Sequence, residues 1–366
     1  MIVRLRPGHG TRMRFIPRSH PRTREDPTVN DSYQPVAPFS AKSLLVCSTG
    51  GHLSELIRLE QRLGVNTDSL WLTFDTPQAR QLLRGRRVHH LPYIGARDLK
   101  GTLSTVPTVA RLLRSERFEV ALSTGSAVAA AALPVAAMRR IPSVFVESVC
   151  RVRGPSTTGR ILQRIPGISL YTQHPEWAGG RWHACESVFS DVRSEPVATP
   201  SRPERLFVTL GTFRGYRFDS LVDAVLASGY ANEKTVWQLG DTEREDALPG
   251  EVHQYLSPTE FNAAARSADV VVTHAGVGTL LEMLAMGIYP VLGTRRAARH
   301  EHVDDHQTEI AEWVNRADLG IAVDGPDLSA EAIERASRRR VRDGRAAAPP
   351  AHRQFARSGN DRRAEH

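Results

Sequence analysis

The sequence is poor in cysteine and in long apolar runs, and each shortage excludes a class of protein. Its 366 residues contain three cysteines (Cys47, Cys150 and Cys185), too few and too scattered for a disulfide framework or a zinc site. The longest apolar stretch, residues 127–138, is rich in alanine and contains Pro134, whereas a membrane-spanning helix needs about 20 apolar residues. No apolar segment follows the first arginines, so we expect no secretory signal. A protein of the reducing cytoplasm is expected.

Positive charge is scarce in the middle of the chain and concentrated at its two ends. Of the formal net charge of +8, residues 1–40 carry +4 and residues 335–366 carry +7, which leaves −3 between them. Both ends are rich in proline, glycine and polar residues, so residues 1–41 and 335–366 are predicted to be a disordered basic arm and tail. Met13 is an alternative start, so the first twelve residues need not be translated.

Arginine-rich tails suit three environments. They can bind an anionic membrane surface, bind nucleic acid, or simply be solvated. No aromatic residues alternate with these arginines to stack on bases, so nucleic acid is the least favoured partner.

The region between the tails repeats one local pattern four times. Each unit is an apolar run, a loop of small residues, and then apolar positions at helical spacing. The four loops are residues 48–51, 123–126, 211–212 and 274–278. Further short strands are predicted at residues 69–73, 143–147, 170–172, 235–239 and 289–292. Strands that alternate with helices predict parallel sheets, whose ligands bind beyond the carboxyl ends of the strands.

The pattern lapses at "SDVRSEPVATPSRPERL", which has three prolines and no periodicity. This stretch predicts a domain boundary. We therefore expect an α/β protein of two Rossmann-like, doubly wound domains that face each other across a cleft. Their expected ranges are residues 42–192 and 204–334, with a linker at 193–203.

The loop at Gly276 and Gly278 has the character of a phosphate site. Glycines at a strand end let a ligand approach the backbone, and the helix N-terminus that follows attracts phosphate. It is not a dinucleotide fingerprint, because Leu281 stands where the third glycine would fall. Thr279 adds a hydroxyl in the first helical turn, and Glu282 lies one turn deeper on the same face. That carboxylate could accept both hydroxyls of a ribose, or could be a solvated or capping glutamate.

A second polar cluster lies in "RHEHVDDHQTEIAEWV". Its histidines raise the question of a metal, since histidine is the commonest transition-metal ligand. The HExxH pattern of zinc-binding helices is absent, and no metal site is expected. Polar contacts to a sugar explain Asp305, His306 and Gln307 better.

These motifs together resemble a known family. "FVTLGT", "VVVTHAGVGTLLEMLAMGIYPVL" and "DDHQTEIA" resemble the donor-binding half of GT-B glycosyltransferases. The likeness is closest to the catalytic subunit of the eukaryotic enzyme that adds the second N-acetylglucosamine to dolichol-linked sugar. "STGGHLSEL", "STGSAVAAAALP", "VFVESVCRVRGPSTTGRIL" and "LYTQHPEW" resemble its membrane-recruiting subunit. Bacterial exopolysaccharide glycosyltransferases use the same two halves, and this chain resembles a fusion of them with the acceptor half first.

The resemblance implies a GT-B fold and two binding loops. The implied donor residues are Gly211, Thr212, His274, Gly276, Gly278 and Thr279 for the diphosphate side, Glu282 for the ribose, and Asp305, His306 and Gln307 for the sugar or ribose. Gly50, Gly51 and His52 resemble the loop that faces the acceptor diphosphate in the peptidoglycan-precursor N-acetylglucosaminyltransferase.

Two residues compete as the general base. His52 stands first after the glycines, and a histidine pKa near 6.5 suits a base at neutral pH, although a packing or capping role is also open. Glu147 ends the predicted strand at 143–147 and is the rival base. Arg151 and Arg153 follow it and are predicted to bind the acceptor, or to form a simple ion cluster with Glu147.

The implied reaction is inverting transfer from a UDP-sugar to a polyprenyl-diphosphate-linked saccharide, without metal or other cofactor. Two alternatives stay open: a UDP-sugar 2-epimerase of the same fold, and a non-catalytic module that recruits a partner transferase to the membrane. The donor sugar cannot be read from the sequence. Peripheral binding at the inner face of the plasma membrane is expected. An apolar stripe with basic edges in residues 99–118 either contributes to it or packs in the core.

Overall fold

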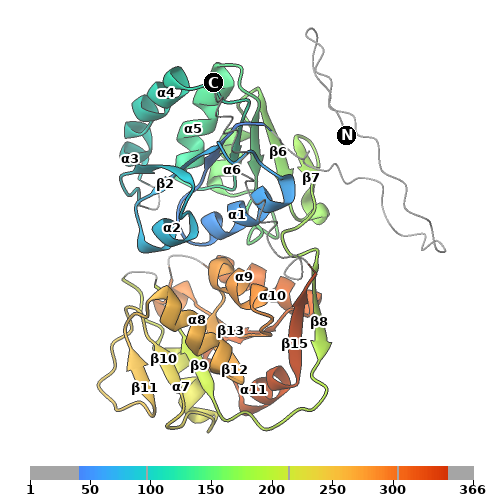
Figure 1. Ribbon diagram of the computed structural model, residues 1–366. Coiled ribbons are helices and arrows are strands. Elements are labelled where there is room, and N and C mark those ends of the chain that lie inside the picture. Colours follow the sequence, from blue (N-terminus) through green and yellow to red (C-terminus); the bar gives the residue numbers. More distant parts are fainter. Residues whose placement is uncertain (1–40, 96–97, 213–214, 303–304, 345–366) are drawn as a thin grey trace, which may run out of the picture. The chain divides into compact units, whose positions relative to one another are not determined.

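The described residues form two parallel sheets, the first of which has seven strands and lies in the N-terminal half (Figure 1). The computed structural model describes residues 41–95, 98–212, 215–302 and 305–344. The strand order is β3-β2-β1-β4-β5-β6-β7. The strands are β1 (Ser43–Val46), β2 (Leu70–Phe74), β3 (Arg87–Leu91), β4 (Val120–Ser123), β5 (Ser143–Val146), β6 (Ile168–Thr172) and β7 (Trp182–Ala184). The helices are α1 (Gly51–Leu63), α2 (Pro77–Leu82), α3 (Leu99–Ser104), α4 (Val106–Ser115), α5 (Ala127–Met138) and α6 (Thr157–Leu162).

The second is a six-stranded parallel sheet in the order β11-β10-β9-β12-β13-β14. Its strands are β9 (Leu206–Thr209), β10 (Val236–Gln238), β11 (Glu251–His253), β12 (Val270–His274), β13 (Val291–Thr294) and β14 (Ile321–Asp324). Its helices are α7 (Asp219–Ala227), α8 (Pro258–Ser267), α9 (Val277–Ala285), α10 (His306–Ala317) and α11 (Ala330–Ser337). The five further strands predicted from the sequence are confirmed as β2, β5, β6, β10 and β13.

Apolar residues on both faces of each strand explain why helices cover both faces of the sheets. In β1, Leu44 packs in the cluster that includes α4 and α5, while its neighbour Leu45 packs in the cluster that includes α1. In β9, Phe207 packs with residues of α8 and Val208 packs with residues of α7. Parallel sheets need this double cover because their strands are apolar on both sides.

The strand order fixes where a ligand can bind. In each sheet the order reverses direction once, between β1 and β4 in the first sheet and between β9 and β12 in the second. Ligands of doubly wound sheets bind beyond the carboxyl ends of the strands at this reversal. All four loops that the sequence singles out follow one of these four strands. The topology therefore places both halves of the predicted site at the reversal points.

The predicted boundaries of linker and tail are wrong in part. Residues predicted as linker form β8 (Val192–Pro196), and residues predicted as disordered tail complete α11 and form β15 (Arg339–Asp343). The two strands pair antiparallel, with Val341 opposite Ser194 and buried. Backbone pairing stabilises these two charged strands. Their sequences lack the apolar periodicity from which a strand could have been predicted. The rest of the basic arm and tail lies outside the described residues.

The two halves also share side-chain contacts within one compact unit of the chain. Arg58 of α1 forms an ion pair with Asp343 of β15. Phe189 stacks on Trp313 of α10 with ring centroids 5.0 Å apart. One cluster of buried apolar side chains contains residues of both α1 and α7.

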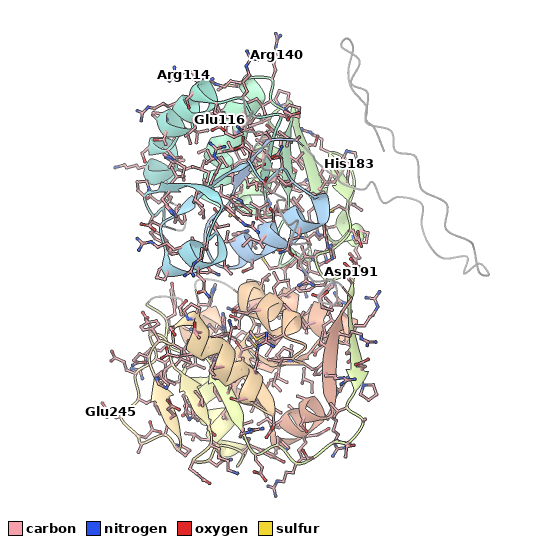
Figure 2. The ribbon with its side chains drawn as sticks, viewed as in Figure 1. Arg114, Glu116, Arg140, His183, Asp191 and Glu245 are labelled. Carbon is pink, nitrogen blue, oxygen red and sulfur yellow. The ribbon has the colours of Figure 1, made fainter. Side chains whose placement is uncertain are left out.

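The apolar stripe of residues 99–118 divides between core and surface. Val109 and Leu113 of α4 are buried, whereas Leu99 and Leu103 of α3 are exposed. Arg114, at the end of α4, is exposed and projects outward (Figure 2). No helix within the described residues has the length and apolar character needed to cross a membrane.

Candidate active site

The loops before α1 and α9 lie against each other. A Cβ atom added to Gly51 would lie 3.3 Å from the backbone nitrogen of Gly278, and one added to Gly278 would lie 3.2 Å from the nitrogen of Gly51. A side chain at either position would require the opposite backbone to move by a few tenths of an ångström. The preceding Gly50 has a φ of 79°, a left-handed conformation that glycine adopts without strain. The predicted acceptor loop and donor loop are therefore parts of one region.

The helix N-termini at this region have no side-chain caps. In α2, α6 and α8, the side chains of Thr76, Ser156 and Ser257 accept hydrogen bonds from the first turn. The caps of α1 and α9 are Gly50 and Gly276, and neither makes a side-chain capping bond. The amide groups of these first turns and the positive ends of two helix dipoles thus meet in one place. Such a place favours an anion, and a diphosphate in particular.

His52 is held by the loop that follows β4. The hydroxyl of Thr124 donates a hydrogen bond to the His52 carbonyl at 2.8 Å. The imidazole packs against Gly125, where an added Cβ would lie 2.7 Å from Cε1 of the ring. The next residue, Ser126, has a φ of 72°, a strained conformation for a residue with a side chain. The side chain of His52 keeps 29% of its surface exposed, so it can reach a substrate.

His274 takes a different position. Its ring lies between two glycines, because Cβ atoms added to Gly211 and Gly276 would lie 2.5 Å and 2.2 Å from ring atoms. Burial lowers the pKa of this histidine to about 3, helped by the charge of Arg295 and by His302. The ring is therefore neutral at physiological pH. The ring packs against the two loops that are predicted to bind the donor. Because it is neutral, it has no positive charge with which to bind a phosphate.

The remaining predicted residues of α9 face outward. Glu282 is exposed, and among the described residues its carboxylate makes no hydrogen bond, although partial burial raises its pKa. Thr279 lies one turn before it and is half-buried, and Thr212 is exposed after β9. Glu282 thus lies one helical turn after Gly278, with its carboxylate exposed on the same face of α9 as Thr279.

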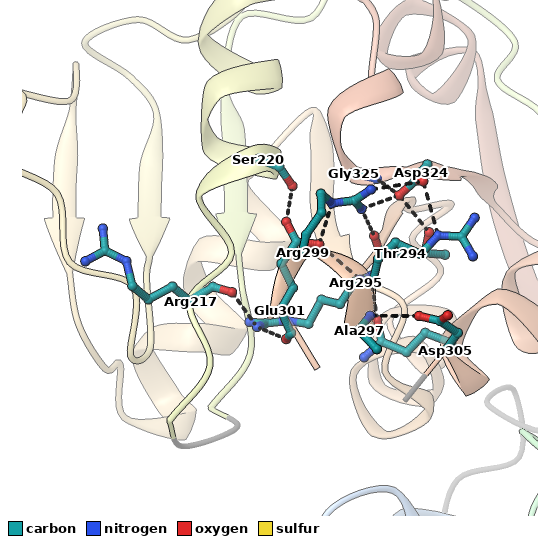
Figure 3. A network of polar contacts seen from close by, with 12 residues as sticks. Arg217, Ser220, Thr294, Arg295, Ala297, Arg299, Glu301, Asp305, Asp324 and Gly325 are labelled. Atoms are coloured by element: carbon teal, nitrogen blue, oxygen red, sulfur yellow. Dashed lines mark hydrogen bonds and ion pairs between the residues drawn. The ribbon is translucent and has the colours of Figure 1, made fainter. Parts of the chain in front are cut away.

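Arg295 is a residue that sequence reasoning missed. Its side chain is almost fully buried at the end of β13, with 2% of the residue exposed. Nη1 donates to the carbonyls of Arg217 and Glu301 (Figure 3). Nη1 also donates to the carbonyl of Tyr216, and Nη2 donates to the carbonyl of Leu210. Burial lowers its pKa to about 10, so it remains charged. One guanidinium thus ties the segment after β9 to the segment before α10.

The same network positions the predicted sugar-binding residues. The backbone N–H of Arg295 donates to Oε1 of Gln307 at 3.2 Å, and Gln307 is buried. Asp305 is exposed and accepts from the backbone N–H of Ala297 at 2.8 Å (Figure 3). His306 begins α10, and its side chain lies outside the described part of the structure. The only hint of the network in the sequence is a pair of arginines directly after the apolar run of β13.

The predicted residues after β5 are engaged with protein groups. Glu147 is buried and accepts hydrogen bonds from the backbone N–H and hydroxyl of Ser156, at 2.8 and 3.0 Å. Burial raises its pKa. Arg153 forms an ion pair with Glu312 at 2.6 Å, and the Arg151 carbonyl accepts from the Trp177 indole at 3.0 Å. Glu147 therefore organises the loop at Ser156, and the geometry favours His52 as the base.

The described part of the chain holds no group of three or more metal-ligating side chains.

Glu55, which sequence reasoning also missed, lies behind His52 on α1 with its side chain fully buried. The spacing of three residues on a predicted helix could have indicated it, since such residues share a face.

Comparison with known proteins finds a glycosyltransferase family model that is similar to the C-terminal half. Residues 208–362 match the model of the glycosyltransferase family 28 C-terminal domain. The UDP-N-acetylglucosamine--N-acetylmuramyl-(pentapeptide) pyrophosphoryl-undecaprenol N-acetylglucosamine transferase of Xanthomonas axonopodis pv. citri (strain 306) is 31% identical over 191 residues, 48% of this chain and 43% of that relative. The transferase of the same name from Parasynechococcus marenigrum (strain WH8102) is 27% identical over 297 residues, 72% of this chain and 78% of that relative.

A solved structure supports the fold over both halves. The crystal structure of Acinetobacter baumannii MurG superposes with a TM-score of 0.53 at 14% identity, covering 85% of this chain and 96% of that chain. This chain spans less than half the length of the Xanthomonas relative that it matches. The chain therefore has a GT-B fold built from two parallel α/β sheets, and residues 208–362 are similar to the glycosyltransferase family 28 C-terminal domain.

Proposed function

We propose that the protein is an inverting glycosyltransferase that uses a UDP-sugar as donor and a lipid-linked saccharide on polyprenyl diphosphate as acceptor. The observation that carries the proposal is the meeting of two uncapped helix N-termini, one in each half, at Gly51 and Gly278. The names of the two relatives support UDP-N-acetylglucosamine as the first donor to test.

The proposed reaction is a direct displacement. The acceptor hydroxyl oxygen forms a bond to the anomeric carbon while the bond from that carbon to the UDP oxygen breaks. His52 takes the proton of the hydroxyl, and UDP leaves with the electron pair of the broken bond. The amides of α1 and α9 stabilise the negative charge that grows on the leaving diphosphate. Glu282 binds the ribose, and Gln307 with Asp305 or His306 contacts the sugar.

The proposed acceptor places the protein at a membrane surface. Tyr93, Leu99 and Leu103 are exposed apolar side chains before and within α3, and Lys100 lies among them. Apolar side chains beside basic ones suit the boundary of an anionic bilayer. This supports peripheral binding at the inner face of the plasma membrane, where such an acceptor would be presented.

Titration with UDP tests the donor site. Isothermal titration calorimetry compares the wild type with Glu282→Ala and with Glu331→Ala, a control that removes an exposed carboxylate from α11 in the same half. We expect Glu282→Ala to weaken UDP binding at least tenfold, about 1.4 kcal/mol, because two ribose hydroxyls lose their acceptor. Glu331→Ala should bind as the wild type does.

The outcomes separate the open alternatives. Absence of UDP binding by the wild type, or equal binding by Glu282→Ala, would contradict the assigned donor site. The second assay supplies radiolabelled UDP-N-acetylglucosamine and a membrane extract. Label that enters the lipid fraction supports transfer. Conversion of the UDP-sugar without extract would indicate an epimerase, and UDP binding without any turnover would indicate a recruiting module.

A further inference from the structure

We propose that Glu55 is a positioning residue that orients the imidazole of His52 by accepting a hydrogen bond from Nδ1. The proposal rests on the proposed function, in which His52 removes the proton of the acceptor hydroxyl. The ring proton then sits on Nδ1, and Nε2 is the nitrogen that acts as base in the proposed reaction. Glu55 touches neither substrate nor reacting atoms, and acts only through His52.

The two side chains share one face of α1. Glu55 follows His52 by three residues, a spacing that places side chains on the same side of a helix. Nδ1 of His52 lies 3.9 Å from Oε2 of Glu55. Hydrogen bonds of catalytic groups are often this long before substrate binds, and shorten when the site fills. The imidazole also packs on Gly125, so its plane is already restricted.

One oxygen of Glu55 is fixed and the other has no partner. Oε1 accepts from the backbone N–H of Val149 at 2.7 Å and from the amide of Gln173 at 3.5 Å. Gln173 is held in turn, because its own oxygen accepts from the backbone N–H of Val188 at 2.8 Å. Oε2 is buried and makes no hydrogen bond among the described residues. A buried carboxylate oxygen without a donor is costly, and the imidazole N–H is in position to supply one.

The burial of Glu55 sets the conditions of the test. Burial raises its pKa to about 8, and the charge of Glu147 adds to this, while the groups of Val149, Ser148 and Gln173 lower it. Above this pKa the carboxylate can only accept hydrogen bonds. A single proton on the neutral imidazole then has to sit on Nδ1. The tautomer of His52 at pH 9 is therefore the direct readout.

Glu55→Gln reverses the hydrogen-bond direction with little change of shape. The single oxygen of glutamine is needed by the N–H of Val149, which leaves the amide NH₂ to face His52. That group donates to Nδ1, and the ring proton moves to Nε2. A ring with its proton on Nε2 cannot act as base there. Glu60→Gln is the control, since Glu60 lies on the same helix and pairs with Arg86 instead.

The experiment measures histidine tautomers by ¹H–¹⁵N correlation spectra of full-length protein at pH 9, with the His52 signal assigned by its loss in His52→Ala. We expect the Nδ1–H tautomer in the wild type and in Glu60→Gln, and the Nε2–H tautomer in Glu55→Gln. In the transfer assay at pH 9, where the Glu55 carboxyl is ionised, Glu55→Gln should lower kcat at least tenfold and leave KM for the UDP-sugar within twofold. An Nε2–H tautomer in the wild type would overturn the proposal. An Nδ1–H tautomer in Glu55→Gln, unchanged from the wild type, would also overturn it.

The test stands apart from the proposed function. The wild-type tautomer is read without substrate, so it decides the point even if Glu55→Gln does not fold. UDP titration of the same sample reports on the donor site separately. Normal UDP binding with the wrong tautomer would refute only the role of Glu55, and the expected tautomer without UDP binding would refute only the proposed function.

Discussion

His52 and His274 occupy related places in the two halves but differ in their surroundings. Each belongs to a strand–loop–helix unit at which its sheet reverses order, and each packs its ring on a glycine of the neighbouring loop, Gly125 or Gly211. His274 precedes the glycines of its loop and ends β12, whereas His52 follows its glycines and lies in the first turn of α1.

The order of histidine and glycine decides what each ring can do. A histidine at the strand end points into the loops around it, and burial there lowers the pKa of His274 to about 3. A histidine in the first helical turn lies beyond the loop and keeps part of its ring exposed. We infer that the ring of His274 supports the loops predicted to bind the donor, and that the ring of His52 takes part in proton transfer.

Replacement of His52 is expected to have the largest effect on activity. His52→Ala should lower kcat for sugar transfer by about 10²–10⁴-fold, because that is the usual contribution of a general base. UDP binding should stay within twofold, since the donor loops keep their support from His274. The measurement is initial rate together with UDP titration.

The control for this prediction is His183→Ala. His183 is an exposed histidine on β7 of the same half, away from the loops of the site (Figure 2). Its replacement should change neither rate nor UDP binding. A His52→Ala enzyme with more than a tenth of wild-type kcat would show that another group removes the proton.

The sequence could predict the fold and the glycine loops because both depend on local pattern. Buried strands such as β1 and β9 read as apolar runs, and glycines mark the loops that follow them. Strands with little buried surface were missed. β3 reads "RVHHL" and is largely exposed, and β15 reads "RRVRD" with one buried apolar residue. Such a segment becomes a strand because it pairs with a neighbouring strand. The residues of the segment itself therefore do not predict a strand.

The buried charges of the site could not be predicted for a related reason. Arg295 is buried because four backbone carbonyls accept its hydrogen bonds, and three of them lie 78 to 85 residues away in sequence. Glu55 is buried because Val149 and Gln173 approach it from beyond β5 and β6. A charged residue in a sequence is expected at the surface unless such partners are known.

Replacement of His274 should change the pH dependence of stability. The folded protein keeps this ring neutral down to about pH 3, while the unfolded chain binds a proton near pH 6.5. Between these values the unfolded state binds more protons, so the contribution of His274 to stability is present above pH 6.5 and falls as the pH falls. Relative to His274→Asn, the wild type should lose about 2 kcal/mol of unfolding free energy between pH 7 and pH 5.

Urea denaturation of both proteins at pH 7 and pH 5 measures this difference. Groups that titrate equally in the two proteins cancel, so the comparison isolates residue 274. A wild-type loss equal to that of His274→Asn would mean that the ring is protonated in the folded state. His274 would then be a cation available to the diphosphate, and its contrast with His52 would disappear.

The smallest expected effect concerns Arg153, whose guanidinium pairs with Glu312 while its backbone N–H donates to Glu309 at 3.1 Å. The pair is exposed, so Glu312→Ala should leave the stability of the protein close to that of the wild type. The variant leaves the guanidinium free, whereas Arg153→Ala removes it. If Arg153 binds the acceptor diphosphate, Arg153→Ala should raise KM for the lipid-linked acceptor several-fold, and Glu312→Ala should leave it equal or lower. Equal KM values in both variants and the wild type would show that Arg153 serves only the ion pair, and would leave acceptor binding to the loop at Gly50 and Gly51.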